Sequence, residues 1–323
     1  MNFSLLLDNL SNPALMFFAL GIISVYLKSD LEIPANSSKF ISLYLLFAIG
    51  FKGGQELSHE SFSMEIAWAM VFGILTSILI PLYTFFLLKR KLTVYDAGAI
   101  AAAYGSVSAV TFVTAASYLE FHQMHLHGYM VAVMALMESP AIIIGLLLIS
   151  IYDTNKIGSE SSKKRTVIVH AFTNGSVLLI LGSLIIGFLT NAKHAEGIKP
   201  FTNDLFKGFL AIFLLDMGIM SGRKLKSFFS SGWFPIAFAI LIPLINGSMA
   251  AILSQFVSND VSNRFIFAVL AASASYIAVP ATVKIAVPKA NPGIYLPMAL
   301  AITFPINITI GLPLFFQLAQ VHI

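Results

Sequence analysis

The stretch "AASASYIAVPATVKIAV", residues 271–287, decides the fold, because it is an apolar segment interrupted by groups that hydrocarbon does not tolerate. Ser273 and Ser275 bring hydroxyls, Pro280 removes a backbone donor and Lys284 brings a charge. Backbone groups left unpaired in a bilayer are costly, so a broken helix survives there only when it is buried in protein or lines a wet cavity. We therefore expect a broken helix beside a hydrated site.

A matching interruption lies in the first half of the chain, at residues 104–115, "YGSVSAVTFVTA". Interrupted segments at corresponding places in two halves of a transporter are the best pointer to its binding site. Free amides at the starts of half-helices and nearby hydroxyls suit a small anion. We predict that the substrate is bound by Ser106, Ser108, Thr111, Ser273, Ser275 and Thr282.

Each interrupted segment also has a simpler interpretation. Small residues let membrane helices pack closely, and a serine can bond to its own helix. That interpretation suits either segment alone, whereas two such segments at matched positions favour a site.

The composition places the chain in a membrane. It has 323 residues, of which 58% are hydrophobic and 11% charged, and its mean hydropathy is +0.86. Soluble proteins carry about 25% charged residues. The net charge of +4 is small and spread over short loops, so we expect no nucleic-acid partner. Cysteine is absent, which excludes disulfides and cysteine-ligated metals. We expect no cleavable signal peptide, because the first apolar run lacks a basic leader and a cleavage site.

Ten apolar stretches are long enough to cross a bilayer. We predict an all-α polytopic protein with spans at 12–28, 39–57, 63–88, 95–119, 127–152, 167–190, 203–222, 231–257, 264–287 and 293–320. Of the 19 Lys and Arg residues, 14 fall in or beside alternate loops, including the loop 153–166. The positive-inside rule therefore places that loop in the cytoplasm and both termini outside.

The sequence predicts two copies of one five-helix unit. The first repeat covers 1–152, a cytoplasmic linker covers 153–166, and the second repeat covers 167–323. Four pairs of stretches match in the same order: "IGFKGGQEL" at 49–57 with "MGIMSGRKL" at 217–225, "ILIPLYT" at 78–84 with "ILIPLIN" at 240–246, "SVSAVTFVT" at 106–114 with "SASYIAVPAT" at 273–282, and "SPAIIIGLLL" at 139–148 with "FPINITIGLPL" at 304–314. An odd number of spans inverts the second copy, as in many secondary transporters.

Glu138 is the predicted cation ligand. It lies near the middle of the fifth span, just before Ser139 and Pro140. An acid at that depth is a functional-site hypothesis by default, and Pro140 can free carbonyls to join it. The other interpretation is a structural partner for a hydroxyl or lysine. Asp216 lies near a span end and suits an interfacial ion pair.

Three histidines, His122, His125 and His127, share one outer loop. Their spacing could bind a metal, but no partner carboxylate is visible in the sequence, so a polar outer turn is the favoured interpretation. No nucleophile elbow, paired catalytic acid or phosphate-binding glycine loop appears. We therefore expect neither an enzyme nor a bound cofactor.

The chain resembles the sodium-dependent bicarbonate transporters first met in cyanobacteria, as a divergent, non-cyanobacterial member. The resemblance runs over almost the whole chain. It is carried by "NPAL" at 12–15, "IGFKGG" at 49–54, "GSVSAVT" at 105–111, "MESPA" at 137–141, "AASASYIAVPATVKIAVPKANPGIY" at 271–295 and "IGLPLFFQLAQ" at 310–320.

The resemblance implies ten helices in two inverted repeats, a core domain that moves against a scaffold like an elevator, and a homotrimer in the bacterial inner membrane. It also implies a substrate site where the broken helices cross, uptake driven by Na⁺, and in some members closure by a cytoplasmic PII-like protein. The family pattern in the second break is Ser-Ser-Ser-Asp, whereas this chain has Ser273, Ala274, Ser275 and Tyr276.

We therefore expect a secondary active transporter that takes up a small anion, bicarbonate first, by Na⁺-coupled alternating access. Loss of the family carboxylate removes a candidate Na⁺ ligand, so two alternatives stay open. One is transport of another small anion, such as a carboxylate, with H⁺ or altered Na⁺ coupling. The other is a passive anion channel.

Overall fold

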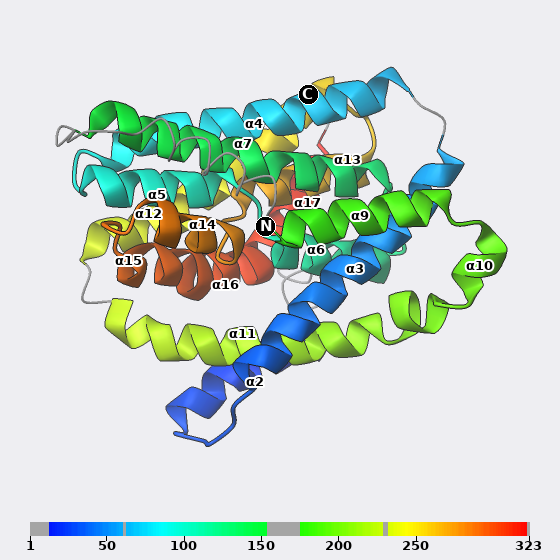
Figure 1. Cartoon of the computed structure of the whole chain (residues 1–323), viewed down its shortest axis with the longest axis horizontal. Coiled ribbons are helices and arrows are strands. Elements are labelled where there is room, and N and C mark those ends of the chain that lie inside the picture. Colours follow the sequence, from blue (N-terminus) through cyan, green and yellow to red (C-terminus); the bar gives the residue numbers. More distant parts are fainter. Residues whose placement is uncertain (1–12, 61–62, 154–174, 229–231, 322–323) are drawn as a thin grey trace.

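The computed structural model describes residues 13–60, 63–153, 175–228 and 232–321, and every regular element in these ranges is a helix (Figure 1). No β-strand occurs in these parts of the chain. The predicted all-α class is therefore confirmed. Most of the predicted linker and the start of the sixth predicted span lie outside the described residues.

The helices follow one another along the whole chain. The first half contains α2 (Pro13–Tyr26), α3 (Ala35–His59), α4 (Met64–Leu88), α5 (Val94–Gly105), α6 (Ala109–Phe121) and α7 (Tyr129–Tyr152). The second half contains α9 (Gly175–Leu189), α10 (Ala192–Glu196), α11 (Phe206–Phe228), α12 (Trp233–Leu253), α13 (Val261–Ala272), α14 (Ala278–Ala286), α15 (Pro292–Pro297), α16 (Phe304–Ile306) and α17 (Leu312–Ala319). Shorter helical turns are η1 (Pro200–Asp204), η3 (Ser254–Phe256), η4 (Met298–Thr303) and η5 (Asn307–Gly311).

Six of the described helical segments are long and apolar enough to cross a bilayer: Met64–Leu88, Val94–Phe121, Tyr129–Tyr152, Pro200–Lys224, Trp233–Phe256 and Pro292–Ala319. They coincide with six of the ten predicted spans. The other four spans fall on α2, α3, α9 and the α13–α14 pair, which are shorter or, in α3, more polar. Those four remain predictions.

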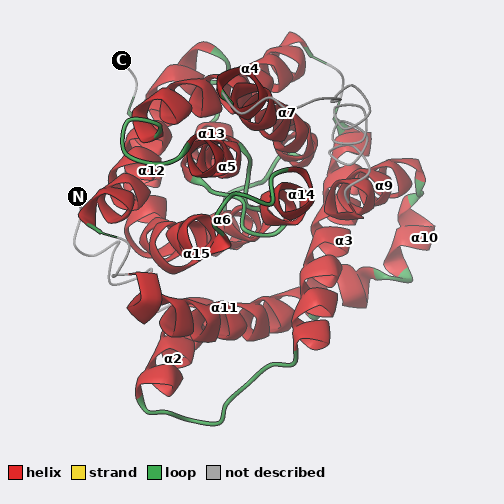
Figure 2. Ribbon diagram, turned by 60° about the vertical axis from the view of Figure 1, so that its left-hand side comes forward, coloured by secondary structure: helices red, strands yellow, loops and turns green. Residues whose placement is uncertain are grey.

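Two groups of helices can be distinguished. α2 packs along α11 and α3 packs along α9, and these four helices cross one another on one side of the molecule (Figure 2). We name them the four-helix layer. The main bundle comprises α4–α7 and α12–α17, in which α4, α5 and α7 pack together and α12 packs on α13. The two groups meet chiefly where α11 contacts η4 and where α3 and α9 contact α7.

Glycines allow the helices of the four-helix layer to approach closely. A Cβ on Gly21 would lie 2.2 Å from the α11 backbone, and one on Gly218 would lie 2.1 Å from the α2 backbone. The other pair repeats this arrangement, since a Cβ on Gly54 or Gly187 would lie 2.1 or 2.2 Å from the facing backbone. Small residues at such crossings are typical of membrane helices.

Large apolar side chains are exposed along the outer faces of α4 and α12. On α4 they include Met64, Trp68, Leu75, Leu79 and Phe86, and on α12 they include Trp233, Leu241, Ile245 and Met249. Contiguous apolar surface of this kind is rare on soluble monomers. These faces are therefore suited to contact with lipid rather than water.

A matched pair of glycine substitutions on α9 tests the close crossing. Gly187→Ala places a methyl group 2.2 Å from the Phe51 carbonyl oxygen, whereas a Cβ on Gly182 meets nothing within 4 Å. Overpacking costs about 1–3 kcal/mol, so we expect Gly187→Ala to lower the thermal unfolding midpoint of the purified protein and Gly182→Ala to leave it unchanged or raise it. Equal midpoints for the two variants would contradict the crossing.

Candidate functional site

Two long apolar segments are each interrupted in the structure. Residues 106–108 separate α5 from α6, and residues 273–277 separate α13 from α14. Both interruptions lie within the stretches that the sequence predicts to be broken, 104–115 and 271–287. A break of this kind removes intrahelical hydrogen bonds, so other groups must take their place.

Serine side chains cap the half-helices at both breaks. Ser106 follows α5 in an extended conformation, and Ser108 precedes α6 in another. The Ser108 hydroxyl accepts a hydrogen bond from the Thr111 amide at 3.2 Å, which satisfies one free amide at the start of α6. In the second break, the Ser275 hydroxyl accepts a hydrogen bond from the Val279 amide at 3.4 Å.

Proline and asparagine complete the second break. Pro280 lies in the first turn of α14, where a missing N–H removes no intrahelical bond. At the end of α13, the Ala272 carbonyl accepts a hydrogen bond at 2.7 Å from the Asn307 side-chain amide. Ser275 within the break and Asn307 outside it thus supply hydrogen bonds that the broken helix lacks.

The two breaks contact each other directly. The Ser275 amide donates a hydrogen bond to the Ala103 carbonyl at 2.8 Å, and the Ser108 amide donates one to the Ser273 hydroxyl oxygen at 3.0 Å. The Ser273 hydroxyl in turn donates to the Leu270 carbonyl at 2.8 Å. Segments about 165 residues apart in the chain are therefore joined by one backbone–backbone bond and one bond from a backbone amide to a serine side chain.

A small cavity of about 20 Å³ lies where the breaks meet. Its walls are Val107, Ser108 and Ala109 of the first break, Ser275–Ala278 of the second break, and Met134 and Glu138 of α7. Leu46 of α3 and Ile180 of α9 close it from the four-helix layer. Such a volume holds about one water molecule, so a larger ion fits only when the walls move apart.

Glu138 supplies the carboxylate of this cavity. It is buried, with 9% of its surface exposed, and it lies two residues before Pro140 in α7. None of the residues that the structure describes donates a hydrogen bond to this carboxylate. Pro140 has no amide to offer to the Leu136 carbonyl one turn earlier. The site therefore holds a buried acid with no protein cation beside it among the cavity-lining residues.

The structure brings part of the predicted site together. Ser108, Ser275 and Glu138 line the cavity, and Ser273 lies directly behind it through its bond to the Ser108 amide. The Ser106 hydroxyl is buried without a hydrogen-bond partner among the described residues.

Four of the six predicted hydroxyls, those of Ser106, Thr111, Ser273 and Thr282, do not line the cavity. Thr282 donates to a carbonyl of its own helix at 3.2 Å, and Thr111 is joined to the break through its backbone amide. Sequence reasoning missed Leu46 and Ile180, because apolar residues on distant helices give no local signal. Tyr276 does line the cavity, and its buried hydroxyl lies near Ser108 without forming a hydrogen bond of good geometry to any described residue.

One protein-family profile matches the part of the chain that contains both helix breaks and the cavity. The profile of the Na⁺-dependent bicarbonate transporter superfamily matches residues 13–320, which include both breaks and every residue that lines the cavity. The chain belongs to this superfamily. No curated protein sequence matches the chain. Superfamily membership confirms the predicted resemblance and identifies a membrane protein of the transporter type.

This superfamily member has a second, larger cavity of about 210 Å³. It lies between α3, α6 and the start of α11, and its charged lining residues are Lys52, Glu56, Glu120 and His125. The small cavity contacts α3 at Leu46 and α6 at Ala109, whereas the larger one contacts α3 at 48–56 and α6 at 116–120. The larger cavity is therefore displaced along the same helices toward the 122–128 loop.

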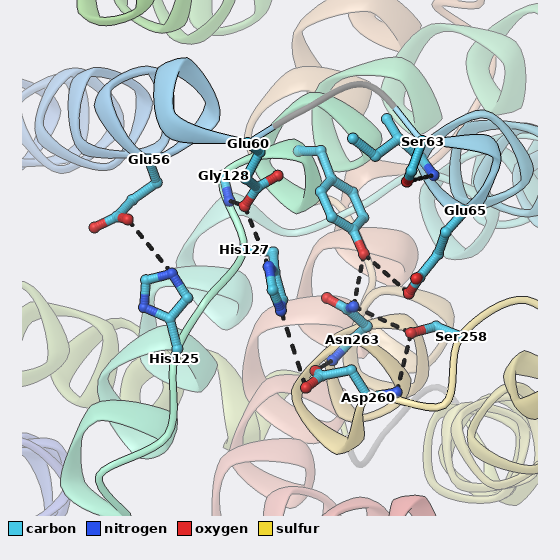
Figure 3. A network of polar contacts seen from close by, with 12 residues as sticks. Glu56, Glu60, Ser63, Glu65, His125, His127, Gly128, Ser258, Asp260 and Asn263 are labelled. Atoms are coloured by element: carbon cyan, nitrogen blue, oxygen red, sulfur yellow. Dashed lines mark hydrogen bonds and ion pairs between the residues drawn. The ribbon is translucent and has the colours of Figure 1, made fainter.

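The polar loops at this end of the transporter form a connected network (Figure 3). Glu60 Oε1 lies 3.2 Å from His127 Nδ1 and accepts a hydrogen bond from the Gly128 amide at 3.2 Å. Asp260 caps α13 and lies 3.9 Å from His127 Nε2. Contact with Asp260, opposed by burial and reinforced by Glu60, raises the pKa of His127 to about 9. The imidazole is therefore protonated at neutral pH when no other cation is bound.

Two tyrosine substitutions test the unpaired hydroxyl at the cavity. A buried hydroxyl without a partner costs about 1–3 kcal/mol, so Tyr276→Phe is expected to leave the thermal unfolding midpoint unchanged or to raise it. The control is Tyr104→Phe, which removes a hydroxyl that bonds to Thr303 Oγ1 at 2.7 Å and should lower the midpoint. Equal losses in the two variants would show that Tyr276 has a partner in the folded protein.

Proposed function

We propose that this protein is a secondary active transporter that imports a small anion, with bicarbonate as the first choice, together with Na⁺ by alternating access. The observation that carries the proposal is the contact between two helix breaks around a cavity that contains one buried carboxylate, Glu138. Membership of the Na⁺-dependent bicarbonate transporter superfamily supports the choice of substrate and coupling ion.

The anion would bind at the starts of α6 and α14. Both half-helices begin at the cavity, and the positive ends of their dipoles favour a negative charge there. Ser108 and Ser275 line the same space, and the Ser106 and Tyr276 hydroxyls, for which no described residue provides a well-formed hydrogen bond, need partners. The oxygens of a small oxyanion would accept hydrogen bonds from these groups. Ser273, Thr111 and Thr282 would then hold the breaks in shape.

The cation would bind at Glu138. Hard cations such as Na⁺ prefer oxygen ligands, and a carboxylate buried in a membrane protein is costly without a counter-charge. The Leu136 carbonyl, which lacks an amide partner because residue 140 is proline, belongs to the residue two positions before Glu138 on α7. Glu138 and this carbonyl therefore offer two oxygens of different kinds to one ion.

The charges explain why the two ions would move together. An anion placed beside an ionised Glu138 meets a like charge in a region of low dielectric, where repulsion is strong. A Na⁺ bound to Glu138 cancels that repulsion. The site thus favours either both ions or neither, which is the requirement for symport.

Movement between the two helix groups would open the site to either side. Leu46 and Ile180 of the four-helix layer cover the cavity, while its other lining residues belong to the main bundle. Displacement of one group against the other would uncover the anion, in the manner of an elevator. The paired glycine crossings of α2 with α11 and of α3 with α9 support two inverted repeats related by an approximate two-fold axis.

The larger cavity would serve as the entrance from the outer side. It lies on α3 and α6 next to the 122–128 loop, which the distribution of Lys and Arg places outside. Lys52 is a half-buried cation on its wall, and it would attract an anion before the anion reaches the breaks.

The proposed function also includes an oligomeric state and a regulatory partner. We infer a homotrimer in the bacterial inner membrane with both termini outside, and a cytoplasmic PII-like regulator as a partner. The family resemblance supports these inferences. Light scattering of the purified protein tests the trimer, and co-purification from cells tests the regulator.

Tyr276 favours a second candidate substrate. It lines the cavity at the position where the family pattern has a carboxylate, so it changes both the charge and the shape of the site. A different small anion, such as a carboxylate, with H⁺ or altered Na⁺ coupling, would suit this change. Competition of unlabelled anions against labelled bicarbonate in liposomes separates the two substrates.

Glu138→Gln tests the cation site. In liposomes with an inward Na⁺ gradient, the unaltered protein should accumulate labelled bicarbonate, and the variant should not, because the neutral amide cannot hold the cation's charge. The control is Glu196→Gln, which removes an exposed acid on α10 and should leave accumulation intact. Flux that ignores every cation gradient in the unaltered protein would instead indicate a passive channel.

Lys52→Gln tests the entrance. Loss of one attracting charge should raise the KM for the anion by roughly threefold and leave kcat close to its original value, because steering acts before binding. Increasing salt should reduce the difference between variant and original. Lys193→Gln, on exposed α10, is the matched control. Equal KM values for the two variants would rule out an electrostatic role for Lys52.

A further inference from the structure

Two histidines of the loop between α6 and α7 lie beside a carboxylate from the end of α3 (Figure 3). One ligand atom from each of Glu60, His125 and His127 can be chosen so that all three lie within 4.8 Å of one another. The histidines are two residues apart, while Glu60 lies more than 60 residues earlier. The tertiary fold thus supplies the carboxylate that the sequence pattern lacks.

We propose that Glu60, His125 and His127 bind a divalent transition-metal ion, for which Zn²⁺ is the best fit. Two imidazoles and one carboxylate are a donor set that Zn²⁺ uses in proteins, with a water molecule as the fourth ligand. Harder ions such as Ca²⁺ and Mg²⁺ prefer sites made of oxygen alone. The site is distinct from the cavity at the helix breaks.

The two carboxylate oxygens of Glu60 differ in their contacts. Its Oε1 accepts a hydrogen bond from the Gly128 amide at 3.2 Å and contacts His127 Nδ1 at the same distance. Its Oε2 is buried and has no hydrogen-bond partner among the described residues. Buried acceptors are nearly always satisfied, and a metal ion bound beside His127 would satisfy this one.

The charge balance also favours a cation. Three carboxylates, those of Glu56, Glu60 and Asp260, surround the two imidazoles at distances of 3.2–3.9 Å. With both imidazoles neutral, the cluster carries three negative charges. A divalent ion bound among these ligands offsets two of them.

Two carboxylates are placed to orient the histidine ligands. Asp260 lies 3.9 Å from His127 Nε2, on the opposite side of the ring from Glu60. If Nδ1 binds the metal, Nε2–H points toward Asp260, which sets the tautomer of the ring. Glu56, 3.4 Å from His125 Nε2, would act on His125 in the same way. Such carboxylate–histidine–metal arrangements are the rule in metal sites.

The exposure of one ligand suits metal capture. The side chains of Glu60 and His127 are 19% and 32% exposed and are held by the polar network, whereas the His125 side chain is 60% exposed. Zn–N and Zn–O distances are about 2.0–2.2 Å, so the ligands must draw together. Rotation of the exposed His125 side chain supplies that movement without disturbing the buried network.

Zinc titration of the purified full-length protein tests the site. After removal of metal with a chelator, isothermal titration calorimetry with Zn²⁺ alone should show one site per chain. Glu60→Gln and His125→Ala should each weaken binding by about tenfold or more, and Asp260→Asn by about 10–100-fold. The control is His194→Ala, on exposed α10, which should bind as the unaltered protein does.

Cobalt provides a second, spectroscopic measurement. Co²⁺ bound by two imidazoles and a carboxylate in tetrahedral geometry should give visible absorption that disappears in His125→Ala. Because His127 belongs to the buried network, the exposed His125 decides the test if His127→Gln does not fold. Absence of stoichiometric Zn²⁺ binding, or affinities unchanged in both Glu60→Gln and His125→Ala, would overturn the proposal.

Discussion

The whole arrangement depends on one constraint, which is that backbone N–H and C=O groups away from water must find partners inside the protein. Each helix break frees several such groups, and the two breaks supply partners to each other. The Ser275 amide bonds to the Ala103 carbonyl, and the Ser108 amide bonds to the Ser273 hydroxyl. Neither break is satisfied alone, so the two halves of the chain must meet where they do. The cavity is a consequence of that meeting.

Two kinds of electrostatic feature then converge on the same point. The starts of α6 and α14 direct partial positive charge into the cavity, and Glu138 brings an ionisable carboxyl group from α7. Because the volume is small and low in dielectric, these features act on any bound ion with little screening. The site lies at the boundary between the main bundle and the four-helix layer, so helices that pack closely through Gly54 and Gly187 form one of its walls.

The loops at the end of the molecule that carries His125 are polar and more exposed. There, capping residues and charged side chains form hydrogen bonds and ion pairs with one another. Glu60, His127 and Asp260 come from three separate connections, yet they form one network in which one Glu60 carboxylate oxygen has no partner among the residues that the structure describes. Three histidines in one loop suggest little by themselves. Only the packing of the end of α3 against the start of α7 makes a coordination set from two of them.

The sequence by itself determined the helical class, the place of the two breaks and the burial of Glu138. Long apolar stretches, prolines and serines affect the backbone locally, so they leave a pattern that can be recognised in a short piece of sequence. It also indicated Ser108 and Ser275, which do line the cavity. The tertiary structure alone decided that Thr282 bonds within its own helix, that Leu46 and Ile180 close the site, and that Glu60 faces the histidines. These contacts join residues far apart in the chain, and their partners are chosen by helix packing, which no short stretch of sequence encodes.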